Sequence, residues 1–191
     1  KRGAERWRRS APEELKPKLP NCAVSPSPVT DGSSVYVFCE SFGLVSYDED
    51  GNERWRMPLG PFTAAPYGMG SSPILAGDRL FLLCDMDTGS FLLAAQKDSG
   101  ELLWKKERPE VTHGFSTPIV YEPPQGPAQL IVSGSYQVAA YSAEDGEKLW
   151  WVSGLSWQAK SPPVIHDGIL FVHSWLASIS ELGPPTTTEP S

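Results

Sequence analysis

Few side chains in this sequence of 191 residues have the types and spacing that chemistry requires. Its three histidines are His113, His166 and His173. An Asp167-Gly168 turn predicts a hairpin that sets His166 opposite Ile169, so His173 lies about four residues, or roughly 13 Å, further along. These two histidines should therefore not share a metal ion. The sequence also contains no nucleophile elbow, phosphate-binding loop or Cys-x-x-Cys motif, and we assign no catalytic, cofactor-binding or metal-ligating residue.

Two acidic stretches have some of the character of calcium loops. They are Asp85-Met86-Asp87-Thr88-Gly89 and Asp48-Glu49-Asp50-Gly51-Asn52. A calcium loop needs several oxygens that converge on one point, and neither stretch has the spacing of a complete loop with its distal bidentate glutamate. Both fall where a repeating pattern requires a turn, so we interpret them as turns.

The pattern behind those turns is a repeat with a period of 45 residues. Four prolines at this spacing open the units: Pro28, Pro73, Pro118 and Pro163. Each closing turn carries a glycine four residues before a tryptophan, in the pairs Gly3 and Trp7, Gly51 and Trp55, Gly100 and Trp104, and Gly146 and Trp150. A period in the forties with several strands in each unit is typical of a β-propeller.

The units predict an all-β fold of four-stranded antiparallel blades, about four of which are present. Apolar runs separated by turn residues such as Asp31-Gly32 indicate the strands. The predicted propeller covers residues 1–176, followed by a disordered Pro/Thr-rich tail at 177–191. Its full blades lie at about 24–57, 72–108 and 116–152, and its partial blades at 1–10 and 161–175.

The recurring glycines and tryptophans have a mechanical explanation. A tight turn between the third and fourth strands needs a residue with positive φ, which glycine adopts without strain. The tryptophan then reaches a fixed place on the outer strand, where its large ring can lie over the neighbouring blade. We therefore interpret all eight residues as structural docking elements.

Cysteine usage gives no disulfide framework, because Cys22, Cys39 and Cys84 are odd in number. Cys39 and Cys84 each lie 11 residues after the proline of their unit, at equivalent strand positions. We interpret both as small buried residues. The alternative is a disulfide from Cys22 to one of them.

His113 is the candidate for a surface site. It begins His113-Gly114-Phe115-Ser116, a predicted loop before the third full unit. Loops at the ends of blades line the faces of a propeller, which is where ligands reach the fold.

The charge of the chain narrows the choice of partners. With 16 basic and 23 acidic residues the net charge is −7, which argues against nucleic-acid binding. No apolar run is long enough to span a membrane, and no signal peptide is visible. Because the sequence opens on KRGAERW, the end of a unit, we expect an upstream part that could carry a signal peptide.

The turn motif carries a resemblance to a known family. Gly51-Asn52-Glu53-Arg54-Trp55, Gly100-Glu101-Leu102-Leu103-Trp104 and Gly146-Glu147-Lys148-Leu149-Trp150 resemble the tryptophan-docking motif of PQQ-like repeats, the quinoprotein-type propellers of the WD40/YVTN-like superfamily. Over residues 1–175 the sequence looks closest to exported bacterial proteins labelled BamB-like. This resemblance implies a ring of seven or eight blades, and a periplasmic or secreted location.

The resemblance implies two kinds of function. One is a non-catalytic scaffold, without cofactor, that binds other proteins or extracellular ligands in the cell envelope. The other is a dehydrogenase that uses pyrroloquinoline quinone and calcium, with an adjacent cysteine pair over the cofactor. Because this sequence has no Cys-Cys, we expect the scaffold and keep a dehydrogenase fragment as the alternative.

About four blades are half of an eight-bladed ring. The chain is either a fragment of a longer propeller or a small ring in which the strand at 5–9 pairs with the last unit. The loss of the pattern after Trp175 favours a fragment. An open array exposes sheet edges, so we expect self-association through them.

Overall fold

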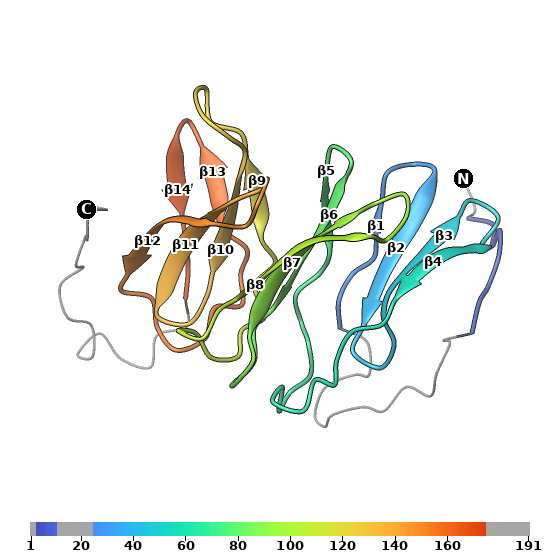
Figure 1. The fold of residues 1–191 in the computed structure, drawn as a ribbon, viewed down its shortest axis with the longest axis horizontal. Helices are drawn as coiled ribbons and strands as arrows, with labels where there is room; N and C mark the ends of the chain where they lie inside the picture. The colour runs from blue at the N-terminus through green and yellow to red at the C-terminus, as the bar shows by residue number, and fades with distance from the viewer. Residues whose placement is uncertain (1–2, 11–24, 175–191) are drawn as a thin grey trace.

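The computed structural model describes residues 3–10 and 25–174, and within these ranges the chain is all-β. Figure 1 shows its strands gathered into separate sheets that stand side by side in chain order. Blade one contains β1 (Val29–Thr30), β2 (Ser34–Cys39), β3 (Gly43–Asp48) and β4 (Glu53–Met57). Blade two contains β5 (Ile74–Ala76), β6 (Arg79–Cys84), β7 (Phe91–Gln96) and β8 (Leu102–Glu107). Blade three contains β9 (Ile119–Tyr121), β10 (Gln129–Ser133), β11 (Gln137–Ser142) and β12 (Lys148–Ser153), and a partial blade four contains β13 (Val164–His166) and β14 (Ile169–Phe171).

Each full blade is an antiparallel meander in which the strands pair in chain order. The first strands of blades one and two, β1 and β5, contact each other. Successive sheets that meet at their first strands form the arc of a β-propeller, as the 45-residue period predicts. The predicted fold class is therefore confirmed.

The middle strands are nearly continuous apolar runs because neighbouring blades cover both of their faces. In β6, Leu80 and Leu82 pack toward blade one, whereas Phe81 and Leu83 pack toward blade three. All four side chains are at most 1% exposed. This alternation follows from the period of two along a strand, and it places one apolar core on each side of blade two.

Hydrogen bonds between equivalent positions join adjacent blades near their first strands. The N–H of Ser27 donates to Ser72 Oγ at 2.9 Å, and the N–H of Ser72 donates to Thr117 Oγ1 at 3.0 Å. Each of these residues directly precedes an opening proline. The repeat is therefore a repeat of contacts as well as of strands.

A β-bulge recurs beside the docking tryptophan in all three full blades. The register between the third and fourth strands shifts just after the pairs Ser46 with Trp55, Ala94 with Trp104, and Ala140 with Trp150. A bulge bends its strand and strengthens the local twist. In blades one and two the bulge thus lies beside a tryptophan whose ring docks on the next blade, a detail that the sequence pattern alone does not predict.

The N-terminal segment differs from the prediction. Residues 3–10 form no strand, although the sequence predicts the last strand of an earlier blade over 1–10. Within the described ranges, residues 3–10 pair with no strand. The indole of Trp7 attaches this segment to blade one by a hydrogen bond to the Glu49 carbonyl. Cys22 and the tail at 177–191 lie outside the described residues.

Candidate functional site

Tryptophan docking holds the blades at fixed positions, and thereby positions the loops at their ends. The indole N–H donates to a carbonyl of the next blade three times, from Trp7 to Glu49 at 3.0 Å, from Trp55 to Lys97 at 2.8 Å, and from Trp104 to Ala143 at 3.4 Å. Each ring lies on the glycine of that next blade, which is Gly51, Gly100 or Gly146. A Cβ on these glycines would come within 2.6 to 2.7 Å of ring carbons.

The glycine and tryptophan of one motif therefore serve different interfaces. Each tryptophan lies on the glycine of the following unit, and each glycine receives the ring of the preceding unit. Nothing in the described structure lies within 4 Å of a Cβ on Gly3. At the other end, the Trp150 indole donates to Gln129 Oε1 of its own blade at 3.1 Å.

A histidine cluster lies where two inter-blade connections meet the β6–β7 loop of blade two. His113, on the β8–β9 connection, shares a short hydrogen bond between its Nδ1 and the carboxylate of Asp87 on the β6–β7 loop. Its Nε2 lies 2.8 Å from Nε2 of Gln158, on the β12–β13 connection. The amide N–H₂ of Gln158 can only donate, so His113 Nε2 accepts and Nδ1 carries the proton. Both nitrogens of a neutral imidazole are thus satisfied.

Three aromatic rings surround this imidazole. Their centroids lie 5.6 Å (Tyr67), 6.0 Å (Phe115) and 5.1 Å (Trp157) from that of His113. His113 is only 5% exposed, whereas Tyr67 and Trp157 are each 42% exposed. The histidine cluster therefore presents aromatic rings and the half-exposed Asp87 carboxylate to solvent, with the histidine beneath them.

The expectation that His113 itself forms a surface site is wrong in this respect. Its ring is buried because Asp87 and Gln158 bind its nitrogens and because three rings cover it. Sequence reasoning missed Tyr67 and Trp157, which are the exposed aromatic members of the cluster. One signal was available, since Gln158 follows His113 by 45 residues, one repeat period.

A buried ion pair lies directly behind the cluster. Arg108 Nε and Nη2 donate to the two carboxylate oxygens of Asp85 at 2.8 and 3.1 Å, and Nη1 bonds the Tyr141 hydroxyl. Both charged side chains are fully buried. Burial raises the pKa of the Asp85 carboxyl above its ordinary value, although the guanidinium pulls it the other way. Asp85 is thus committed to Arg108, and its role goes beyond the turn that the sequence predicts.

The second acidic stretch is a turn, as the sequence indicates. The Asp48 carboxylate accepts the N–H groups of Asp50 and Asn52 at 2.9 and 2.7 Å, and the Asn52 side chain at 3.0 Å. These hydrogen bonds, led by that of the Asn52 side chain, lower the pKa of Asp48. Within residues 3–10 and 25–174, no group of three or more His, Cys, Asp or Glu side chains could hold a metal ion.

The remaining reactive residues lie apart from the histidine cluster. His166 is paired with Ile169 across the β13–β14 hairpin, which confirms the register predicted from Asp167-Gly168. Cys39 and Cys84 are both fully buried, and burial raises the pKa of the Cys84 thiol. Because Cys22 is not described, the disulfide alternative stays a prediction.

Comparison with known proteins identifies the family. A family model described as outer membrane protein assembly factor BamB matches residues 1–121 and 92–182. The chain belongs to this BamB-like family of PQQ-like repeat propellers. A comparison with curated proteins finds no match. Among the described residues, there is no helix that is long and apolar enough to cross a membrane.

Solved structures share the fold of this BamB-like chain. BamB from Moraxella catarrhalis has a TM-score of 0.60 at 16% identity over 79% of this chain and 47% of its own. Quinohemoprotein alcohol dehydrogenase from Comamonas testosteroni has a TM-score of 0.55 at 18% identity, and the match covers 69% of this chain and 21% of that protein. A europium-containing methanol dehydrogenase has a TM-score of 0.51 at 19% identity, and the match covers 68% of this chain and 24% of that protein. The chain spans less than half the length of these proteins, and identities this low show the fold alone.

Proposed function

We propose that this chain is part of a non-catalytic propeller that binds other proteins in the bacterial cell envelope. The observation that carries the proposal is the pair of half-exposed rings, Tyr67 and Trp157, that both contact the buried His113. Tyrosine and tryptophan are enriched among the residues that dominate the binding energy of protein interfaces. The Asp87 carboxylate beside them supplies a polar, charged contact.

The rigidity of the histidine cluster supports a binding role. Its residues come from separate loops, and hydrogen bonds to both nitrogens of His113 fix them together. A further bond from the N–H of Phe115 to the carbonyl of Ala159, at 3.0 Å, joins two of these loops. A preorganised surface loses little conformational entropy when a partner binds.

Family membership supports the location and the kind of partner. The model of the matching family is described as an outer membrane protein assembly factor, and BamB from Moraxella catarrhalis shares the fold of this chain. A periplasmic or secreted scaffold that contacts other proteins is consistent with the net charge of −7 and with the exposed aromatic rings.

The second candidate function is a fragment of a dehydrogenase that uses pyrroloquinoline quinone and calcium. Its support is the shared fold of quinohemoprotein alcohol dehydrogenase. The residues of this chain fit that cofactor poorly. The sequence has no adjacent cysteine pair, Cys39 and Cys84 are buried in different blades, and Asp85 is committed to Arg108.

The binding proposal is tested by crosslinking in the host bacterium. A photoreactive phenylalanine derivative replaces Trp157 in the histidine cluster or, as the matched control, Trp151 on β12, which is 40% exposed. We expect a discrete protein adduct from position 157 that Tyr67→Ala weakens. The absence of adducts at position 157, or the same adducts from position 151, would contradict the proposal.

A titration of the folded, purified chain with pyrroloquinoline quinone and calcium separates the two functions. We expect no saturable change in absorbance and no rise in melting temperature. Saturable binding with a raised melting temperature would favour the dehydrogenase and overturn the non-catalytic assignment.

A further inference from the structure

The exposed side of the histidine cluster combines two aromatic rings with one carboxylate. Tyr67 and Trp157 are half-exposed, and their ring centroids lie 5.6 and 5.1 Å from that of His113. The two centroids are therefore at most about 11 Å apart, so one cation can lie within reach of both rings. Asp87, which is also half-exposed, bonds Nδ1 of the same imidazole. These groups from three different loops thus share one small area of the surface.

The negative charge of this carboxylate is not balanced by a cation. Among the residues that the structure describes, no lysine or arginine forms an ion pair with Asp87. Its hydrogen-bond partner His113 is neutral, because Nε2 accepts a hydrogen bond from Gln158. A carboxylate beside the electron-rich faces of aromatic rings attracts a cation, since both kinds of group interact favourably with positive charge.

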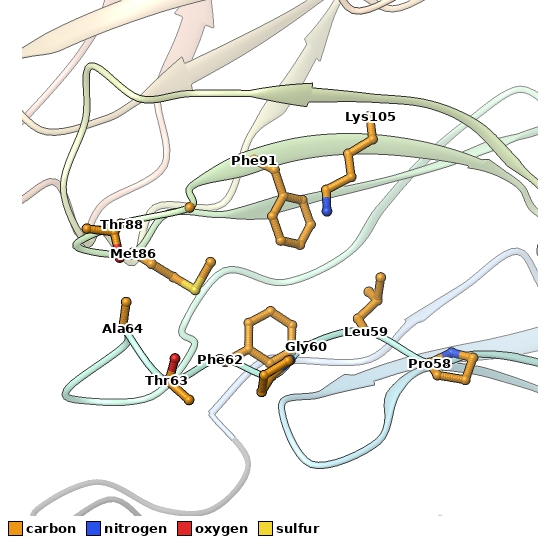
Figure 2. Close-up of a pocket in the computed structure, with 12 residues that line it drawn as sticks. Pro58, Leu59, Gly60, Phe62, Thr63, Ala64, Met86, Thr88, Phe91 and Lys105 are labelled. Carbon is orange, nitrogen blue, oxygen red and sulfur yellow. The ribbon is translucent and has the colours of Figure 1, made fainter.

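The β6–β7 loop holds the carboxylate in a fixed place. The N–H of Asp87 donates to the carbonyl of Ala64, on the β4–β5 connection, at 2.9 Å. Ala64 lines a cleft of about 340 Å³ together with Met86 and Thr88, the sequence neighbours of Asp87, and Figure 2 shows these three close together. Nζ of Lys105 points into the same cleft and repels cations there. A cationic ligand is therefore directed to the histidine cluster and away from the cleft.

The kind of cation follows from what this surface offers. A primary ammonium has three N–H donors, and its removal from water costs free energy unless each donor finds an acceptor. The surface offers mainly ring faces and one carboxylate. A quaternary ammonium has no N–H donor, is about 6 Å across and is recognised through aromatic faces, so one such group can touch both rings.

We infer that the histidine cluster binds a quaternary ammonium group, which packs against Tyr67 and Trp157 with Asp87 as its counter-ion. This ligand class goes beyond the proposed protein-binding function and does not depend on it. The same chemistry is found in small molecules and in the headgroup of a phospholipid.

Choline is the probe, and neohexyl alcohol is its matched control. The control carries a quaternary carbon in place of the nitrogen, so the two differ in charge and hardly in shape. Binding to the purified 191-residue chain is followed by NMR, through the indole N–H signals of the protein and the N-methyl signal of choline, at constant ionic strength. We expect choline to shift the Trp157 signal saturably at millimolar concentration and the neutral control to bind at least about tenfold more weakly.

Two pairs of variants locate the site. Asp87→Asn removes the charge but keeps an acceptor for His113, whereas Asp78→Asn removes an exposed carboxylate on the β5–β6 turn of the same blade. Trp157→Ala removes one ring, whereas Trp151→Ala removes a tryptophan of similar exposure on β12. We expect about a fivefold loss of affinity for choline in the first member of each pair and none in the second.

Thermal melting checks that each of these variants is folded. The four substituted side chains are all at least 40% exposed, so the variants should melt close to the parent. The comparison of choline with its neutral control uses the parent chain and needs no variant.

Vesicles separate the two sources of a quaternary ammonium group. Cosedimentation with phosphatidylcholine vesicles, but not with phosphatidylglycerol vesicles, would identify a lipid headgroup as the ligand. Choline binding without cosedimentation would identify a free small molecule. Both results support the site, because each requires recognition of the same group.

Three outcomes would overturn the inference: equal binding of choline and its neutral control, unchanged affinity in Asp87→Asn, or no saturable binding of choline at about 50 mM. None of them bears on protein adducts at position 157 in the host, so the protein-binding function would stand without the ligand site. Conversely, choline binding without such adducts would leave the ligand site standing and remove the protein-binding function.

Discussion

Arg108 is the largest fully buried side chain among the described residues, and it forms an ion pair with the equally buried Asp85. Removal of one partner from such a pair leaves the other charge buried without compensation. We expect Arg108→Met to lower the free energy of unfolding by about 3–5 kcal/mol in urea titrations. The exposed pair of Arg8 and Glu5 is the control, and Arg8→Met should change little.

A second variant separates the ion pair from simple packing. If the loss reflects an orphaned carboxylate, Asp85→Asn combined with Arg108→Met should be more stable than Arg108→Met by itself. Additive losses in the double variant would show that the carboxylate is not the cause.

The lowered pKa of a single residue, Asp31, predicts that the stability of the fold depends on pH. Partial burial raises its pKa, but the N–H groups of Ser33 and Ser34 and the ammonium of Lys97 outweigh this effect and hold the pKa well below its usual value. A lowered folded-state pKa stabilises the fold above the unfolded-state pKa, near 3.9, and this contribution is lost as the pH falls below it. Asp31→Asn should therefore melt a few degrees below the parent at pH 7 and pH 5.

The same melting curves at pH 2 provide the check on Asp31. There the Asp31 carboxyl of the unfolded chain is largely protonated, so most of the stability that its lowered folded-state pKa contributes is lost and the gap between the two proteins should shrink. A gap of the same size at pH 2 and pH 7 would mean that Asp31 contributes through shape and not through its charge.

At the scale of the element, the docked pair of glycine and tryptophan makes a distinctive prediction. Gly100 has φ of 74°, and a Cβ there would lie 2.6 Å from the Trp55 ring. Gly77 has φ of 59° but nothing within 4 Å of a Cβ. Both alanine variants suffer the strain of positive φ, about 1–2 kcal/mol, and only Gly100→Ala also displaces a ring, at a further 1–3 kcal/mol or so.

Urea unfolding of these two variants therefore isolates the docking contact. A larger loss for Gly100→Ala than for Gly77→Ala is the expected result. Equal losses would mean that Gly100 is required for its backbone conformation alone. In that case the ring of Trp55 could shift away from the turn without cost.

At the scale of the whole molecule, the partial blade has an exposed apolar face among the residues that the structure describes. Ile165 and Leu170 on one face of β13–β14 pack on blade three. On the other face Val164, Ile169 and Phe171 are 57%, 59% and 53% exposed. Apolar strand faces of this kind promote association, and they are the positions that a following blade would cover.

We expect the 191-residue chain by itself to self-associate through this face at high concentration. Sedimentation velocity should show oligomers that Phe171→Glu removes. Leu102→Glu on β8, at a residue 49% exposed, is the control and should leave them. Oligomers that persist in Phe171→Glu would place the contact elsewhere.

The sequence by itself determined the blades. The signals that specify them are local: prolines at 45-residue spacing, Asp-Gly turns and the Gly-x-x-x-Trp motif. Each of these determines the conformation of only a few neighbouring residues. The strands, their meander order and the turns at Gly51 and Gly100 could therefore be predicted from the sequence. The one hairpin register predicted, His166 opposite Ile169, also follows from a local turn.

Only the tertiary structure decided the candidate site. His113, Asp87 and Gln158 come from different loops, and the distances between them do not follow from spacing along the chain. Those distances depend on the angle at which each blade meets the next. The bulges beside Trp55 and Trp104 and the docking of these rings on Gly100 and Gly146 accompany that angle, and the docking is a contact between blades that a repeat pattern does not specify.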